Sequence, residues 1–322
     1  MISTDEVVIE GIAVSRGKGE PLLDLAVESS RVALGSDRVG LESSRVALGS
    51  DRVGLGSDRV ELGSGETLMD SKETLKDPIP IAAVVAATFS NPDRFPSLAV
   101  KVASALGLPS STPAFDLQMA CSAYPYALYL AGRLSADLGG RVLVIDGDVQ
   151  SPLVDPSDHA TGAIFSDACT ASVVSVRGTS AARSHFDFLS RADGALECSA
   201  QGPIKMDGFA VFSFVATEVS KFIGAFLDGV AEREGIDPRA LQFAPHQANP
   251  YMVRRLAEAL GLSEGLLAIP DDFKNPGSCS VPMALAMKGK PGRAVVAGFG
   301  AGLSASVGIV RLADGAFRGG IE

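Results

Sequence analysis

The chain has 322 residues, of which 46% are hydrophobic and 20% are charged, and this composition supplies a substantial globular core rather than a disordered chain. The net charge of −10 at pH 7 argues against nucleic acid or an anionic membrane as the main partner, because an acidic surface is repelled by both. No run reaches the 18 or so consecutive apolar residues of a membrane span, and the first residues lack the basic start and apolar core of a signal peptide. We therefore expect a cytoplasmic protein with a length typical of two domains.

Residues 29–77 consist of seven-residue units such as SSRVALG and SDRVGLE. Their apolar residues are spaced two and then five apart, as in Val32, Leu34 and Val39, whereas a coiled-coil seam needs spacings of three and four. A glycine near the end of most early units also disfavours a helix. We expect an inserted, loosely ordered segment with no role in chemistry, and short stacked strands are the structured alternative.

After the repeats, patterns typical of buried strands alternate with patterns typical of helices. In the first half, strands are predicted at residues 81–89, 141–146 and 171–176, and helices at 97–106 and 123–134. In the second half, helices are predicted at 211–232 and 250–260, and strands at 241–245, 293–299 and 305–312. Such alternation predicts an α/β protein with helices covering sheets. The similarity of RVLVIDGD and ACTASVVSV to RAVVAGFGAGLSASVGIVRL indicates two related halves, residues 1–176 and 177–322.

The four cysteines, Cys121, Cys169, Cys198 and Cys279, show none of the spacings typical of a zinc site. In a reducing compartment such cysteines are mostly small buried hydrophobes. Cys121 differs, because AFDLQMACSAYPYALYLAGRL predicts a strand followed by a helix and places this thiol at the helix start. The helix dipole there favours a thiolate, so we expect Cys121 to be the most readily alkylated cysteine.

Three further segments carry polar or glycine-rich patterns. His246 in APHQANPYMVRRL ends a predicted strand, and Asn275 in KNPGSCSVP lies in a turn before a helix. The GFGAG segment at residues 298–302 is followed by a second strand rather than by a helix, which argues against a dinucleotide-binding loop. It is either a tight structural turn or a turn whose backbone N–H groups face a site.

Together, the segments around Cys121, His246 and Asn275 resemble the β-ketoacyl-acyl-carrier-protein synthase III family of the thiolase fold. The resemblance covers most of the chain and also includes DLAVESSRVAL, RFPSLAVKVASALGL, DPSDHATGAIFSDACTASVV, KMDGFAVFSFV and GFGAGLSASVGIVRL. It implies a five-layer αβαβα fold of two similar halves and a homodimer. It also implies decarboxylative Claisen condensation of a cysteine-bound acyl starter with malonyl-acyl carrier protein, in fatty-acid or specialised-metabolite biosynthesis, without a metal or organic cofactor.

The resemblance assigns a role to each member of this set. Cys121 takes an acyl group from a thioester, because a thiolate both attacks and leaves well. His246 and Asn275 donate N–H groups to the malonyl carbonyl as CO2 leaves, and such donors stabilise the enolate. The backbone N–H groups of Cys121 and Ala301 form the oxyanion hole.

The resemblance also suggests residues around this centre. Phe95 matches a position that shapes the acyl pocket across the dimer interface, although it is as easily a core or interface residue, and Phe212 is a second candidate for the substrate pocket. Arg254 and Arg255 are candidates for docking the acidic helix of a carrier protein. Positions at which the family grips coenzyme A carry other residues here, namely Asp5, Ile9, His159, Ser213 and Tyr251. This loss favours a carrier protein over coenzyme A as the acyl donor.

Two alternatives to condensation remain open. An acyltransferase would pass the acyl group from Cys121 to an alcohol or amine, but it would not need Asn275 to stabilise an enolate. A catalytically silent chain would instead stabilise a second ketosynthase as a heterodimer, and the intact set of Cys121, His246 and Asn275 argues against this interpretation.

Overall fold

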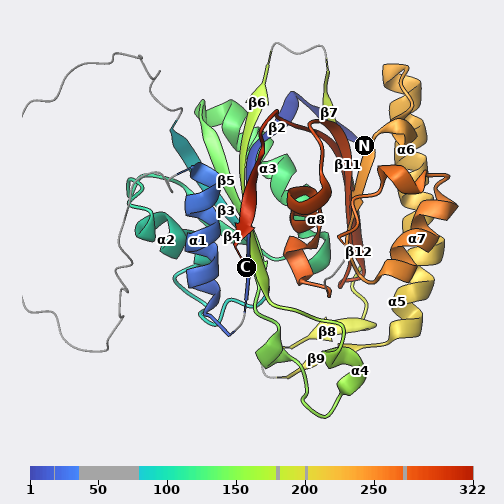
Figure 1. Ribbon diagram of the computed structural model, residues 1–322, viewed down its shortest axis with the longest axis horizontal. Coiled ribbons are helices and arrows are strands. Elements are labelled where there is room, and N and C mark those ends of the chain that lie inside the picture. The colour runs from blue at the N-terminus through green and yellow to red at the C-terminus, as the bar shows by residue number, and fades with distance from the viewer. Residues whose placement is uncertain (18, 36–79, 179–181, 200–201, 271–273, 322) are drawn as a thin grey trace, which may run out of the picture.

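Alternating helices and strands build both halves of the chain, in a computed structural model that describes residues 1–17, 19–35, 80–178, 182–199, 202–270 and 274–321 (Figure 1). The first half contains strands β1 (Ile2–Thr4), β2 (Glu6–Arg16), β3 (Ile81–Ala87), β4 (Ala114–Leu117), β5 (Arg141–Asp148) and β6 (Ala168–Arg177), and helices α1 (Leu22–Leu34), α2 (Leu98–Ala105), α3 (Ala123–Leu138) and α4 (His159–Gly162). The second half contains strands β7 (Ser184–Ser190), β8 (Leu196–Cys198), β9 (Ile204–Met206), β10 (Gln242–Pro245), β11 (Gly292–Gly300), β12 (Ser304–Leu312) and β13 (Phe317–Ile321), and helices α5 (Gly208–Phe214), α6 (Ser220–Glu234), α7 (Pro250–Ala259) and α8 (Ser280–Lys288).

The two halves share one strand order. In the first half the strands lie side by side as β2-β6-β5-β3-β4, and in the second half as β7-β12-β11-β10. Short parallel pairing between β12 and β2 joins the halves, and each end of the chain crosses to the other half, because β1 pairs with β7 and β13 pairs with β2. The prediction of an α/β fold from two similar halves is therefore confirmed.

Helices occupy three layers around these strands (Figure 1). Helices α1 and α2 pack on the outer face of the first-half strands, and α5, α6 and α7 pack on the outer face of the second-half strands. Helices α3 and α8 lie between the two sets and share one hydrophobic core with both. Strand β3, IAAVVAA, is apolar on both faces because helices cover both of its faces.

The first repeat unit belongs to a helix. Ser29 and Ser30 are buried in α1, where their hydroxyls donate to backbone carbonyls one turn earlier. Gly35, with a φ of 76°, ends the helix in the left-handed conformation that glycine adopts without strain. The prediction of a loose segment is thus wrong for residues 29–35, because Val32 and Ala33 pack into the core. Residues 36–77 of the predicted insertion lie outside the described residues.

The helical run Gly208–Glu234 joins α5, the π-helical segment Val215–Val219 and α6. In the described part of the chain it is the one helix long and apolar enough, by length and composition, to cross a membrane. A core helix meets the same criterion, and Ile223 and Leu227 of this run are fully buried against the second-half strands.

Candidate active site

Cys121 lies in a short 3-10 turn, η2 (Ala120–Ser122), between β4 and the start of α3. Ala120 has a φ of 43°, in the left-handed region that L residues rarely adopt, so the surrounding contacts must hold this turn. The Ser122 hydroxyl provides two such contacts, with the Met119 carbonyl at 2.9 Å and the Ser304 hydroxyl at 2.7 Å. The Cys121 turn is therefore fixed to the start of β12.

The glycines of the GFGAG segment allow β11 to touch this turn. A Cβ atom on Gly298 would lie 2.8 Å from the Cys121 carbonyl oxygen, and one on Gly300 would lie 2.9 Å from the Cys121 Cβ. Neither approach leaves room for a side chain. The turn after β11 consequently places the Ala301 backbone N–H against the Cys121 sulfur, which gives the segment the geometry of the functional interpretation.

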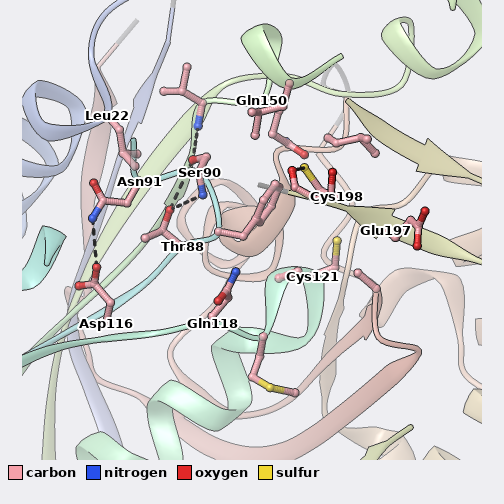
Figure 2. Close-up of a pocket in the computed structure, with 18 of the residues that line it drawn as sticks. Leu22, Thr88, Ser90, Asn91, Asp116, Gln118, Cys121, Gln150, Glu197 and Cys198 are labelled. Carbon is pink, nitrogen blue, oxygen red and sulfur yellow. Dashed lines mark hydrogen bonds between the residues drawn. The ribbon is translucent and has the colours of Figure 1, made fainter. Parts of the chain in front are cut away.

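The Cys121 thiol is buried, and burial is the main reason that its pKa rises to about 12. The negative charge of Asp148 raises the pKa further, whereas the backbone N–H groups of Ala301 and Cys121 lower it. Burial thus opposes the thiolate that the helix start is expected to favour, and it acts more strongly on the pKa than these N–H groups do. Cys198 lines the same cavity with an exposed side chain (Figure 2), and this exposure favours its alkylation over that of the buried Cys121.

His246 follows β10 and is buried beside β11. Its backbone N–H donates to the Ala297 carbonyl at 2.7 Å, and its ring meets the Phe299 ring edge to face at 5.3 Å. The Nδ1 atom lies 2.5 Å from the Ser280 hydroxyl at the start of α8. Burial lowers the pKa of His246 to about 3, so the ring is neutral at physiological pH.

Asn275 is held by its backbone and by one side-chain oxygen. Its N–H donates to the Ile164 carbonyl, and its carbonyl accepts from the Ser166 N–H. The Oδ1 atom accepts from the Gly277 N–H at 3.0 Å. No hydrogen bond from the described residues engages the Nδ2 amide, which leaves that group as the available donor.

Asp148 and Gln150, at the end of β5, connect these parts and were missed by sequence reasoning. Asp148 accepts hydrogen bonds from Ser278 and from the loop that follows β3. The Gln150 side-chain amide donates to the Asn275 carbonyl at 3.1 Å. The available signal was the two polar residues, Asp148 and Gln150, within four positions of the apolar strand RVLVID.

A cavity of about 1030 Å³ opens at Cys121 (Figure 2). Its walls include Met119, Phe165 and Ala301, the loop after β3, and the β8–β9 hairpin. His246 and Asn275 do not line this cavity. They are linked to it instead, because Asn275 bridges to Phe165 and bonds to Gln150, a wall residue, while His246 packs on the strand that supports Cys121.

The structure places the outer candidates as follows. Phe95 is 85% exposed and lies next to wall residues of the cavity without lining it. Phe212 stacks on Tyr251 at 6.2 Å and packs on the outer helix layer, so it also lies outside this cavity. Arg254 and Arg255 are exposed on α7, and each pairs with a carboxylate of this chain, Glu264 at 3.5 Å and Glu258 at 2.6 Å respectively.

One of the positions at which the family is expected to bind coenzyme A lies in the core of this chain. Ile9 is fully buried in the middle of β2, where it pairs with β6 and β12, so it does not face an entrance. His159, Ser213 and Tyr251 are exposed. Among the described residues, no three His, Cys, Asp or Glu side chains form a group that could hold a metal ion.

Sequence comparison agrees with this layered architecture. Residues 115–194 match 3-oxoacyl-[acyl-carrier-protein] synthase III, and residues 231–312 match its C-terminal domain. The chain is similar to β-ketoacyl-[acyl-carrier-protein] synthase III of Lactobacillus delbrueckii, with 31% identity over 74% of this chain and 80% of the relative. The counterpart in Rubrobacter xylanophilus is 30% identical over 71% of this chain and 75% of the relative.

Solved structures show the same fold. The 3-oxoacyl-(acyl carrier protein) synthase III of Pseudomonas aeruginosa superposes with a TM-score of 0.74 at 23% identity, over 96% of this chain and 99% of that one. The priming β-ketosynthase of the R1128 polyketide pathway superposes with a TM-score of 0.73 at 23% identity, over 98% of each chain.

The structures show a thiolase fold, and the sequence relatives place the chain in the condensing-enzyme class. More closely, the chain belongs to the β-ketoacyl-[acyl-carrier-protein] synthase III family, as its motifs predict. It is therefore a transferase of the ketosynthase III type.

Proposed function

We propose that the chain condenses a Cys121-bound acyl group with a malonyl thioester. The observation that carries this proposal is the Asn275 side chain, whose Oδ1 is engaged by Gly277 while Nδ2 is left to donate. When the malonyl thioester loses CO2 beside the acyl-cysteine, its carbonyl becomes an enolate and needs such a donor. Transfer of the acyl group to an alcohol or amine forms no enolate, so that reaction does not need the Asn275 amide as a donor.

In the first half-reaction, the sulfur of Cys121 attacks the carbonyl carbon of an acyl thioester. A C–S bond forms, the donor thiol leaves with the proton that Cys121 gives up, and the acyl group remains on the enzyme. The backbone N–H groups of Cys121 and Ala301 face the sulfur and stabilise the tetrahedral oxyanion.

In the second half-reaction, a malonyl thioester loses CO2, and the resulting enolate attacks the acyl carbon. The neutral His246 ring supports this step if the Ser280 hydroxyl donates to Nδ1, because the ring proton then lies on Nε2 and can be donated to the enolate oxygen. Asn275 Nδ2 supplies the second donor. The new C–C bond forms as the C–S bond to Cys121 breaks, which gives a β-ketoacyl thioester and a Cys121 thiolate that takes up a proton from solvent.

The proposal includes a homodimer and acyl carrier protein as the bearer of the malonyl group. The exposure of Phe95 beside the cavity wall supports a partner subunit at this face. Thioester cleavage and CO2 release drive the reaction, so the proposed chemistry needs neither a metal nor an organic cofactor.

Intact-mass measurement after exposure to a panel of acyl donors tests the proposal. The wild-type chain should gain one acyl mass, and Cys121→Ala should gain none. The matched control is Cys198→Ala, which removes the exposed thiol of the same cavity and should be acylated like wild type. Acylation that persists in Cys121→Ala would refute the nucleophile, and acylation followed by transfer to an alcohol without CO2 release would favour the acyltransferase.

A further inference from the structure

Asp148 is a buried carboxylate for which the proposed mechanism has no role. It ends β5 and is completely shielded from solvent. Building on the proposed function, we propose that Asp148 is a positioning residue that acts on the two half-reactions in opposite directions. Its hydrogen bonds hold the turn that carries Asn275 for decarboxylation, and its negative charge restrains the Cys121 thiol from attacking.

The two oxygens of Asp148 bind two different segments. Oδ2 accepts from the Ser278 N–H at 3.0 Å and from the Ser278 hydroxyl at 2.7 Å. Oδ1 accepts from the Phe89 N–H at 2.9 Å and from the hydroxyls of Thr88 and Ser90 at 3.0 and 3.1 Å. Asp148 therefore ties the loop after β3, which lines the Cys121 cavity, to the turn before α8.

The hydrogen bonds between Asp148 and Ser278 affect Asn275 through Gly277. Gly277 has a φ of +68°, and a Cβ atom there would lie 2.7 Å from Asp148 Oδ2, so the turn can approach the carboxylate only with glycine at this position. The N–H of the same Gly277 holds Asn275 Oδ1. Consequently, the contact between Asp148 and Ser278 determines where Gly277 lies, and Gly277 determines which way the Asn275 amide points.

Of the two buried acids on β5, Asp148 carries the charge. Five donors converge on Asp148, whereas neither side-chain oxygen of Asp146 has a hydrogen-bond partner among the described residues. Donors stabilise an ionised carboxylate, and burial without donors favours the neutral acid. Burial raises the pKa of both acids, but hydrogen bonds from Ser278, Phe89 and Thr88 lower that of Asp148 in part, whereas the pKa of Asp146 is raised well above its usual value.

The remaining titratable groups around Asp148 are neutral. Cys121, on η2, feels the charge of Asp148, as do the thiols of Cys169 on β6 and Cys279 at the start of α8. Burial raises the pKa of all three thiols, and His246 is neutral as well. Asp148 is the carboxylate whose charge raises the pKa of Cys121, and removing that charge favours the thiolate.

Asp148→Asn removes the charge but keeps the size of the side chain, and Ser278→Ala removes one hydrogen bond but keeps the charge. We expect Asp148→Asn to increase iodoacetamide labelling of Cys121 at pH 8 by about three- to tenfold, since one pKa unit is a factor of ten. The same variant should reduce CO2 release from the malonyl thioester by at least about tenfold. Ser278→Ala should reduce CO2 release by about fivefold and leave labelling within about twofold of wild type.

Ser135→Ala is the matched control, because this buried hydroxyl bonds to Gly140 and Val176 at the end of α3 remote from Cys121 and its loss should change neither readout. A fall of both readouts in Asp148→Asn, or unchanged labelling, would overturn the proposal. If that variant does not fold, unchanged CO2 release by Ser278→Ala overturns it instead. A wild-type chain that is never acylated at Cys121 would refute the proposed function, whereas the labelling comparison would still decide the effect of the charge.

Discussion

Labelling of Cys121 by a small neutral alkylating reagent should rise steeply between pH 7 and pH 9 without reaching a plateau. With its pKa raised to about 12 by burial and by Asp148, the thiolate fraction is about one in 10⁵ at pH 7 and about one in 10³ at pH 9. Because the thiolate is the reactive form, we expect the labelling rate to rise about a hundredfold over this range. Cys198, with its exposed side chain, should be labelled before Cys121 at every pH.

The assay is timed exposure to iodoacetamide, followed by digestion and mass spectrometry of each cysteine peptide. Cys169 and Cys279 are fully buried and serve as internal controls, because their labelling would report unfolding rather than local reactivity. A labelling curve for Cys121 that levels off with a midpoint below about pH 8, or labelling of Cys121 ahead of Cys198, would refute the reasoning. Either result would mean that the helix start and the Ala301 N–H outweigh burial.

Three further results are expected. His246→Ala and Asn275→Ala should each still allow acylation of the nucleophile but reduce malonyl decarboxylation by at least about a hundredfold, measured as CO2 release; full condensation by the Asn275 variant would favour the acyltransferase. Deletion of residues 36–49 should leave activity and melting temperature nearly unchanged, since even halving a loop changes its closure free energy by only about 0.6 kcal/mol and this deletion removes less than half of residues 36–77. A large fall in melting temperature would show that the repeats pack as structure. Acyl carrier protein should acylate the chain faster than the matching acyl-coenzyme A. In low salt, Arg254→Glu should lower the rate of acylation from the carrier protein, and Glu264→Gln, which frees Arg254 from its ion pair, should raise it. Equal rates for both donors would contradict the carrier preference.

Strands of this fold were predictable where helices cover both faces. A strand with two covered faces needs an unbroken apolar run, and β3 and β11 have such runs. The start of α5 was placed too late, at residue 211, because apolar periodicity is weak in its first turn. The Asp207 side chain, which accepts from the Ala210 N–H, caps the helix there, and this local signal was present in the sequence.

The candidate site was predictable in part. Cys121, His246 and Asn275 stand in motifs whose local order is visible in the sequence, whereas the bond between Asp148 and Ser278 joins residues 130 positions apart. The burial that raises the pKa of Cys121 could not be predicted for a related reason. A helix start is a local feature worth about 1 kcal/mol, but desolvation depends on every segment that covers the thiol and shifts a pKa by up to several units.

In the proposed mechanism, burial that makes Cys121 a poor thiolate also makes His246 a suitable donor for decarboxylation. A protonated imidazole would form an ion pair with the carboxylate of a malonyl group and so stabilise the group that must leave as CO2. With the pKa of His246 lowered to about 3, the ring stays neutral through the physiological range. It can then donate a hydrogen bond to the developing enolate oxygen without binding the departing carboxylate as a cation. In the proposed mechanism, burial of each group thus slows the first half-reaction, through the thiol, and favours the second, through the imidazole.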